Sequence, residues 1–246
     1  MSTRRIVAAL VRHGDYHQPE RVPSAQLPHP LTDKGVGQAR ELGPALAREA
    51  EAHGLVLDPV LDCSTLLRAR QTAELAAAGL DALGSAGERR FEVAEFLALS
   101  ERSVGAAANL TVDAIVEALA QDHRFPPIPP GWKAHPRFQL PVPGAESLMM
   151  AGARVAAHIE TRVHSLRHAA RDSADTAGVL KVFVSHGGAL RHAAVCMGAL
   201  ELETVPKVSM HHCGFVLVEH TPDPDGGPGR WTKIGGRWKQ RSSATD

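Results

Sequence analysis

Short runs rich in branched aliphatic residues alternate along this chain with longer segments in which apolar residues recur at helical spacing. The strand-like runs are RIVAALV (5–11), PVLDCST (59–65), RFEVAEFL (90–97), VLKVFVSH (179–186) and GFVLVEH (214–220). Such alternation is typical of βαβ units, whose strands form a mainly parallel sheet. We therefore expect an α/β fold, a three-layer α/β/α sandwich around a mainly parallel central sheet.

The segments between these runs predict helices. We expect them over about 31–54, 66–78, 112–120 and 147–170, with a further helix after SHGG (185–188). Thr32 is a suitable N-cap for the first helix. Pro44 lies inside that helix and is expected to bend or break it, because proline lacks the N–H that an interior helical residue donates.

Length and proline content predict the domain organisation. A chain of 246 residues with this alternation favours one domain over residues 1–246. Of the 17 prolines, four lie in residues 15–30 and seven in residues 123–145, so both segments are predicted to be long ordered loops with a function. The C-terminal residues are expected to form a frayed basic tail.

Charge and cysteine content exclude several classes of protein. Lys+Arg and Asp+Glu number 27 each, so the chain has no overall field that would attract nucleic acid or an anionic membrane. Cys63, Cys196 and Cys213 contain no C-x-x-C pair, which argues against a disulfide framework or a zinc ribbon. Apolar runs are shorter than the roughly 20 residues of a membrane span. We expect a soluble, cytoplasmic protein.

Polar motifs follow the ends of four predicted strands. They are Arg12-His13-Gly14, STLLRARQTA (64–73), LSERSVG (99–105) and SHGG (185–188). In an open parallel sheet, ligands bind at the carboxyl ends of the strands, so these motifs are expected to meet at one edge.

The residue types in these motifs suit a phosphate ester. The guanidinium groups of Arg12 and Arg68 match phosphoryl oxygens, and their charge lowers the pKa of a nearby imidazole such as His13, which then remains a nucleophile. Glu101 can protonate the leaving oxygen. The N–H groups at the helix start near Gly187 favour an anion.

The motifs resemble those of the histidine phosphatase superfamily, in its phosphoglycerate mutase-like branch. Arg12-His13-Gly14 is similar to the R-H-G signature of that family. Further similar elements are LTDKG (31–35), STLLRARQTAE (64–74), PGAES (143–147) and VSHGGALRH (184–192). The resemblance extends from about Ile6 to Glu219 and implies a phosphoglycerate mutase-like fold.

The resemblance also implies roles for individual residues. His13 becomes phosphorylated, Arg12, Arg68 and His186 hold the phosphoryl oxygens, and Glu101 acts first as acid and then as base. Glu95 is a nearby alternative to Glu101. The site is expected to need neither a metal nor a cofactor.

Departures from the family pattern bear on the activity. Many relatives follow R-H-G with Glu, then Ser or Thr, and later Asn, whereas this chain has Asp15, Tyr16 and His17. Residues 105–120 contain no Lys or Arg that could hold the carboxylate of a phosphoglycerate. We therefore favour hydrolysis of a small phosphorylated substrate. The alternatives are a phosphoglycerate-type mutase and, third, a non-catalytic module that binds a phosphorylated ligand.

Several polar and aromatic residues outside these motifs have two interpretations. Glu146 either complements a helix dipole or supports the site, and His211 and His212 are either loop residues or contacts of the phosphate rim. Trp132 and its aromatic neighbours form either a lid core or a substrate clamp, and the clamp is slightly favoured. His164 and His168 are predicted to be solvated rather than metal ligands.

Overall fold

The sheet at the centre of the protein is mostly parallel, as expected. The computed structural model describes residues 4–23, 25–84, 90–171, 177–225, 227 and 229–241. Strand order is β4-β3-β5-β1-β7-β8, and β2 pairs with β5. Strands β1 to β5 run parallel, whereas β7 and β8 form an antiparallel edge. The strands are β1 Ile6–Arg12, β2 Leu55–Leu57, β3 Val60–Ser64, β4 Glu92–Phe96, β5 Gly178–Ser185, β7 Phe215–Thr221 and β8 Arg230–Gly236.

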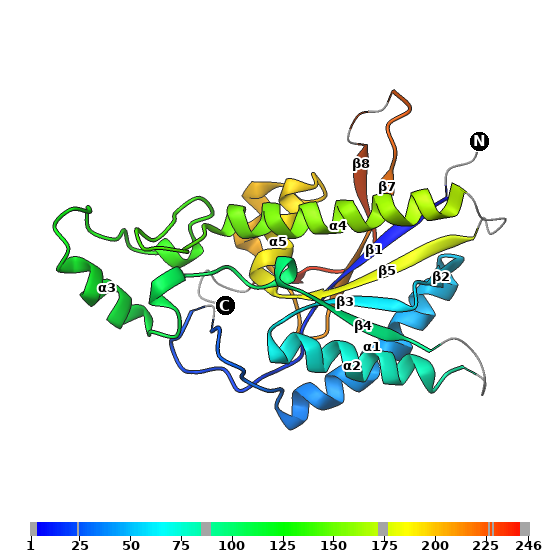
Figure 1. Cartoon of the computed structure of the whole chain (residues 1–246), viewed down its shortest axis with the longest axis horizontal. Coiled ribbons are helices and arrows are strands. Elements are labelled where there is room, and N and C mark those ends of the chain that lie inside the picture. The colour runs from blue at the N-terminus through cyan, green and yellow to red at the C-terminus, as the bar shows by residue number, and fades with distance from the viewer. Residues whose placement is uncertain are drawn as a thin grey trace.

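Helices cover both faces of this sheet and complete the three layers. Figure 1 shows α1 and α2 on one face and α4 and α5 on the other. The helices are α1 Asp33–Ala52, α2 Leu67–Asp81, α3 Val112–Ala120, α4 Leu148–Arg171 and α5 Gly187–Cys196. Shorter elements are the 3₁₀ turns η1 Leu97–Leu99, η2 Gly105–Ala107, η3 Trp132–Ala134 and η4 Leu202–Lys207, and the strand pair β6 Val208–Ser209 and β9 Lys239–Gln240.

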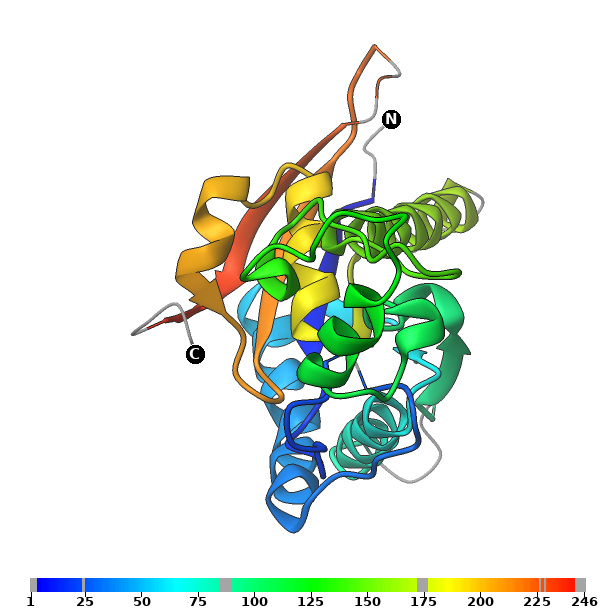
Figure 2. The ribbon, with the colours of Figure 1, turned by 90° about the vertical axis from the view of Figure 1, so that its left-hand side faces the viewer.

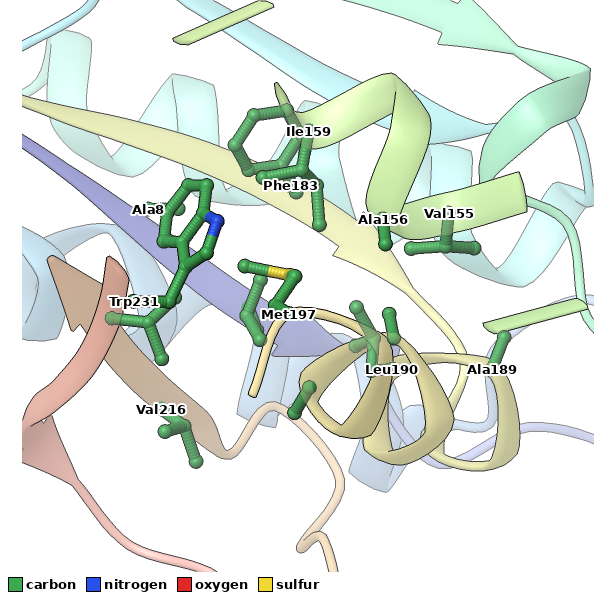
Figure 3. Packing of buried hydrophobic residues seen from close by; sticks show 14 of the residues in the cluster. Ala8, Val155, Ala156, Ile159, Phe183, Ala189, Leu190, Met197, Val216 and Trp231 are labelled. Carbon is green, nitrogen blue, oxygen red and sulfur yellow. The ribbon is translucent and has the colours of Figure 1, made fainter. Parts of the chain in front are cut away.

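The alternation of side chains along β1 divides the core in two. Ile6, Ala8 and Leu10 belong to the cluster beneath α4 and α5, and Val7, Ala9 and Val11 belong to the cluster beneath α1 and α2. Figure 3 shows the first cluster, with Phe183, Ile159 and Trp231 packed on the same face. The strand is buried on both faces, which explains why its sequence is continuously apolar.

Of the bend or break expected at Pro44 in the first helix, the break is wrong. Helix α1 continues through Pro44, and Thr32 caps it by accepting a hydrogen bond from Gly35 N at 3.1 Å. The helix packs closely on α2 at this point: a Cβ placed on Gly43 would lie 2.4 Å from the carbonyl oxygen of Ala76. This packing stabilises the helix across the proline.

Both proline-rich segments lie at the end of the sheet to which the parallel strands point, and the first of them contacts the chain just before α3 (Figures 1 and 2). Oδ1 of Asn109 accepts hydrogen bonds from Gln26 N at 3.0 Å and Leu27 N at 3.2 Å. Residues 104–145 have a small core of their own, formed by Val104, Ala107, Ile115, Trp132, Leu140 and Ala145. We call residues 103–145 the lid.

The C-terminal part of the chain adds β8 and β9 to the fold. Most of the predicted frayed tail, residues 242–246, lies outside the described residues. Among the helices of the described ranges, none combines the length and apolar character needed to cross a membrane.

Candidate active site

His13 lies immediately after β1, at the carboxyl edge of the sheet. Its side chain is buried, and its Nδ1 lies 2.8 Å from the carbonyl oxygen of Gly14. Because a carbonyl only accepts hydrogen bonds, Nδ1 carries the proton and Nε2 keeps its lone pair. Burial, together with the charges of Arg12 and Arg68, holds the pKa of His13 well below its usual value. The ring is therefore neutral and nucleophilic near pH 7.

Two guanidinium groups share this buried region. Arg68, in the first turn of α2, is 2% exposed, and within the described ranges its Nε and Nη1 have no hydrogen-bond partner. Nε of Arg12 is likewise unpartnered among described residues, while its Nη1 donates to the carbonyl of Met210 at 2.7 Å. Burial lowers the pKa of both groups. Buried, unpaired cationic donors are costly, so their arrangement indicates an anion site.

His186 precedes α5 and faces the nucleophile. Its ring centroid lies 5.0 Å from that of His13, and its Nε2 lies 2.9 Å from Ser64 Oγ. Burial and the charge of Arg68 hold the pKa of His186 well below its usual value. A Cβ on Gly187 would lie 3.2 Å from Cδ of Arg12, so glycine lets the helix start approach that side chain. The predicted residues Arg12, His13, Arg68, His186 and Gly187 thus lie together.

Of the two candidate acids, Glu101 lies beside the start of α5, where its charge acts on Arg12 and Arg68. Its Oε1 accepts hydrogen bonds from Arg102 N at 2.9 Å and from Ala189 N at 3.1 Å, at the start of α5. Glu95 lies on the edge strand β4, where it is exposed and pairs with Arg70. Glu101 therefore lies at the anion site, and Glu95 belongs to a surface ion pair.

Glu146 supports the segment that carries Glu101. Its carboxylate forms two hydrogen bonds with Arg154 of α4, at 2.9 and 2.8 Å, and accepts one from Ser103 N at 3.0 Å. Arg154 also donates to three main-chain carbonyls within 97–100, at 2.8 to 3.3 Å. The ion pair thus holds the chain on both sides of Glu101. This contact favours the supporting interpretation of Glu146.

Three further side chains lie at the site. The sequence left His212 open between a loop residue and a contact of the phosphate rim, and its ring position beside His13 favours the rim. Tyr16 packs edge-on against His13 with ring centroids 5.1 Å apart, and the Arg68 guanidinium lies 4.5 Å from the Tyr16 ring centroid. The ring of His212 lies 5.8 Å from that of His13, and its Nδ1 lies 3.2 Å from Asp15 Oδ1. Tyr16 and Asp15 come directly after R-H-G, and this position in the sequence could have indicated that they lie at the site. His212 belongs to no motif and is brought here by the pairing of β7 with β1.

Arg102 is a cation that the sequence interpretation overlooked. It is 3% exposed, lies 5.6 Å from the Trp132 ring centroid and donates to the carbonyl of Lys133 at 3.2 Å. Trp132 is buried in the lid core, with its ring centroid 6.3 Å from that of Phe138. The preference for an aromatic substrate clamp is therefore wrong for these two rings, since their surfaces are used in lid packing.

The described residues contain no group of three or more His, Cys, Asp or Glu side chains arranged to hold a metal ion. His164 lies against His220, with ring centroids 6.0 Å apart. The acid–base groups of the site are instead surrounded by guanidinium and main-chain N–H donors.

Known proteins resemble this chain in sequence and in fold. The chain is 29% identical over 175 residues to a 2,3-bisphosphoglycerate-dependent phosphoglycerate mutase of Parvibaculum lavamentivorans, covering 71% of each. Its fold matches a mycobacterial glucosyl-3-phosphoglycerate phosphatase with a TM-score of 0.64 and 22% identity, covering 98% of this chain and 100% of that one. A putative alpha-ribazole-5'-P phosphatase of Escherichia coli matches with a TM-score of 0.62 and 19% identity, covering 96% of each chain.

The family assignment rests on a match that spans most of the sequence. The model of the histidine phosphatase superfamily (branch 1) matches residues 8–225, which contain the R-H-G motif at the end of β1 and the SHGG motif at the start of α5. The chain belongs to the histidine phosphatase superfamily.

Proposed function

We propose that this protein is a phosphomonoesterase that hydrolyses a small phosphorylated substrate through a phosphohistidine at His13. One observation carries the proposal. The unprotonated ring nitrogen of His13 shares a buried site with guanidinium donors of Arg12 and Arg68 that have no partner among the described side and main chains. A nucleophile surrounded by unpaired cationic donors is suited to a phosphoryl group.

The reaction has two steps. Nε2 of His13 attacks phosphorus, the bond to the ester oxygen breaks, and Glu101 donates its proton to that leaving oxygen. Water then attacks the phosphohistidine, its proton passes to Glu101, and inorganic phosphate leaves. Arg12, Arg68 and His186, with the N–H groups near Gly187, stabilise the charge on the phosphoryl oxygens in both steps. The scheme uses neither a metal nor a cofactor.

A phosphoglycerate-type mutase is the second candidate, and two observations favour it. The curated relative is named as a mutase, and Arg102 places a buried cation next to Glu101. In that case the phosphohistidine would return its phosphoryl group to a bound acceptor. The absence of Lys and Arg from residues 105–120 favours water as the acceptor. A module that only binds phosphorylated ligands is third, since Arg12, His13, Arg68 and His186 are all retained.

The deciding assay follows inorganic phosphate released from a panel of phosphate esters in the presence of EDTA. We expect phosphate in amounts equal to the ester consumed, and inhibition by vanadate, which adopts the trigonal-bipyramidal geometry of the transition state. Interconversion of 2- and 3-phosphoglycerate faster than phosphate release would replace the proposal with the mutase. Restoration of an EDTA-inactivated enzyme by a divalent ion would contradict metal independence.

A further inference from the structure

Asp15 and His212 form a polar pair beside the nucleophile that the two reaction steps above do not use. Nδ1 of His212 lies 3.2 Å from Asp15 Oδ1, and the His212 ring is tilted by 32° to that of His13 at a centroid distance of 5.8 Å. Oδ2 of Asp15 accepts a hydrogen bond from Thr32 Oγ1 at 2.8 Å, which fixes the carboxylate at the start of α1. The pair is therefore held on two sides, by the helix cap and by the loop before β7.

The surroundings of His212 keep it neutral while the site is empty of anions. The carboxylate oxygen of Asp15, 3.2 Å from Nδ1, favours the proton on that nitrogen, and Nε2 is buried with no partner among the described atoms. Burial and the positive charges of Arg12, Lys34 and Lys239 outweigh the attraction of Asp15 and lower the pKa of His212 to about 4. These are the charged groups that face the ring from β1, α1 and β9.

An anion on His13 changes this balance. A doubly negative group about 6 Å away increases the proton affinity of an imidazole roughly 10⁴-fold at the effective dielectric of a protein site. His212 also lines a hollow of about 450 Å³, together with Glu49, His211 and Arg237, so its side chain faces solvent through this hollow. A proton can therefore reach the ring from water when the charge of the site changes.

We propose that His212, held by Asp15, takes up a proton from solvent when a phosphoryl group or a similar oxyanion occupies His13. The imidazolium is then a third cation of the site, beside Arg12 and Arg68, and it returns the proton when phosphate leaves. This inference rests on the proposed function, because it requires an oxyanion at His13. In this inference His212 gains and loses a proton during the reaction and so compensates the changing charge, whereas the guanidinium groups of Arg12 and Arg68 stay protonated throughout.

Calorimetric titration with vanadate at pH 6.5, in buffers of different ionisation enthalpy, counts the protons taken up on binding. We expect the wild-type protein to take up about one proton more than His212→Gln, and His211→Gln to match the wild type. His211 is the matched control because it is the adjacent histidine and is exposed. Asp15→Asn should take up less than the wild type at pH 6.5 and recover at lower pH, because the imidazolium loses its carboxylate partner.

Equal proton uptake by the wild type and His212→Gln, with vanadate bound to both, would overturn the inference. Failure of the wild type to bind vanadate would count against the proposed function instead. If His212→Gln does not fold, histidine Cε1–H resonances of the wild type give the same answer. One resonance should titrate at least two pH units higher with vanadate than without it, and this change should be reduced in Asp15→Asn. If no histidine resonance shifts its titration in this way, the inference is likewise overturned.

Discussion

Glu101 and Glu95 are close in sequence but have different surroundings. Glu101 accepts two main-chain hydrogen bonds at the anion site, and Glu95 pairs with Arg70 on the surface. If Glu101 is the general acid, Glu101→Gln should slow phosphorylation by alkyl phosphates by roughly 10²- to 10⁴-fold. The loss should be much smaller with p-nitrophenyl phosphate, because its leaving group departs without a proton.

Single-turnover phosphorylation rates with the two kinds of ester measure this difference. Glu95→Gln is the matched control and should remain within about twofold of the wild type, as expected for a surface ion pair. A large loss in Glu95→Gln with little change in Glu101→Gln would reverse the assignment.

Most of the residues at the site were predictable because they stand at strand ends. Arg12 ends β1, and His13 and His186 follow β1 and β5 directly, so a correct prediction of parallel strands also brings them together. For His212 the sequence could not decide between a loop residue and a contact of the phosphate rim, because its position depends on an antiparallel pairing between segments about 200 residues apart. Arg102 was overlooked although it is adjacent to Glu101, because its burial depends on the lid packing over it.

At the scale of elements, α4 and η1 together determine where Glu101 lies. Arg154 binds both Glu146 and main-chain carbonyls of residues 97–100. The substitution Arg154→Lys removes the planar guanidinium, and an ammonium group cannot make all of these hydrogen bonds at once. We expect kcat with alkyl phosphates to fall about tenfold while KM changes little, because a small displacement of Glu101 slows proton transfer without weakening substrate binding. In a Glu101→Gln background the same change should have almost no effect.

A double-mutant cycle on kcat measures this dependence. Arg162→Lys is the control, since Arg162 lies on the same helix but pairs with Asp62. Equal losses from Arg154→Lys with and without Glu101 would show that Arg154 acts on the fold and not on the acid.

Elements with strong local signals were predicted well, and those defined by tertiary contacts were not. The expected helix at 112–120 coincides with α3, and the long helix expected at 147–170 is α4, Leu148–Arg171. Strand β2 has three residues and is defined by its pairing with β5, so its sequence carries little periodicity. The continuity of α1 through Pro44 depends on close packing against α2, which the sequence of α1 alone does not show.

For the whole molecule, buried neutral histidines predict how stability depends on pH. Burial lowers the pKa of His13, His186 and His192 in the folded protein, so the unfolded chain binds more protons below its own histidine pKa of about 6.5. Their contribution is fully present above that pH and is lost as the pH falls below it. Each histidine should contribute about 1.4 kcal/mol per pH unit to this loss.

Urea unfolding between pH 5.0 and 7.5 tests this expectation. His186→Gln should flatten the dependence by the contribution of one histidine. A free energy of unfolding that stays constant from pH 7 to pH 5 would show that these side chains are protonated in the folded state.

The most direct test of the account is to trap the phosphorylated enzyme and locate the phosphate. We expect rapid quenching during turnover, followed by peptide mapping, to find an acid-labile, base-stable phosphate on His13. His13→Ala should fold normally, carry no such phosphate and lose at least 10³-fold in turnover, while His17→Ala, at an exposed position nearby, should behave as the wild type. Turnover without a phosphoenzyme, or phosphate on another residue, would contradict the central claim.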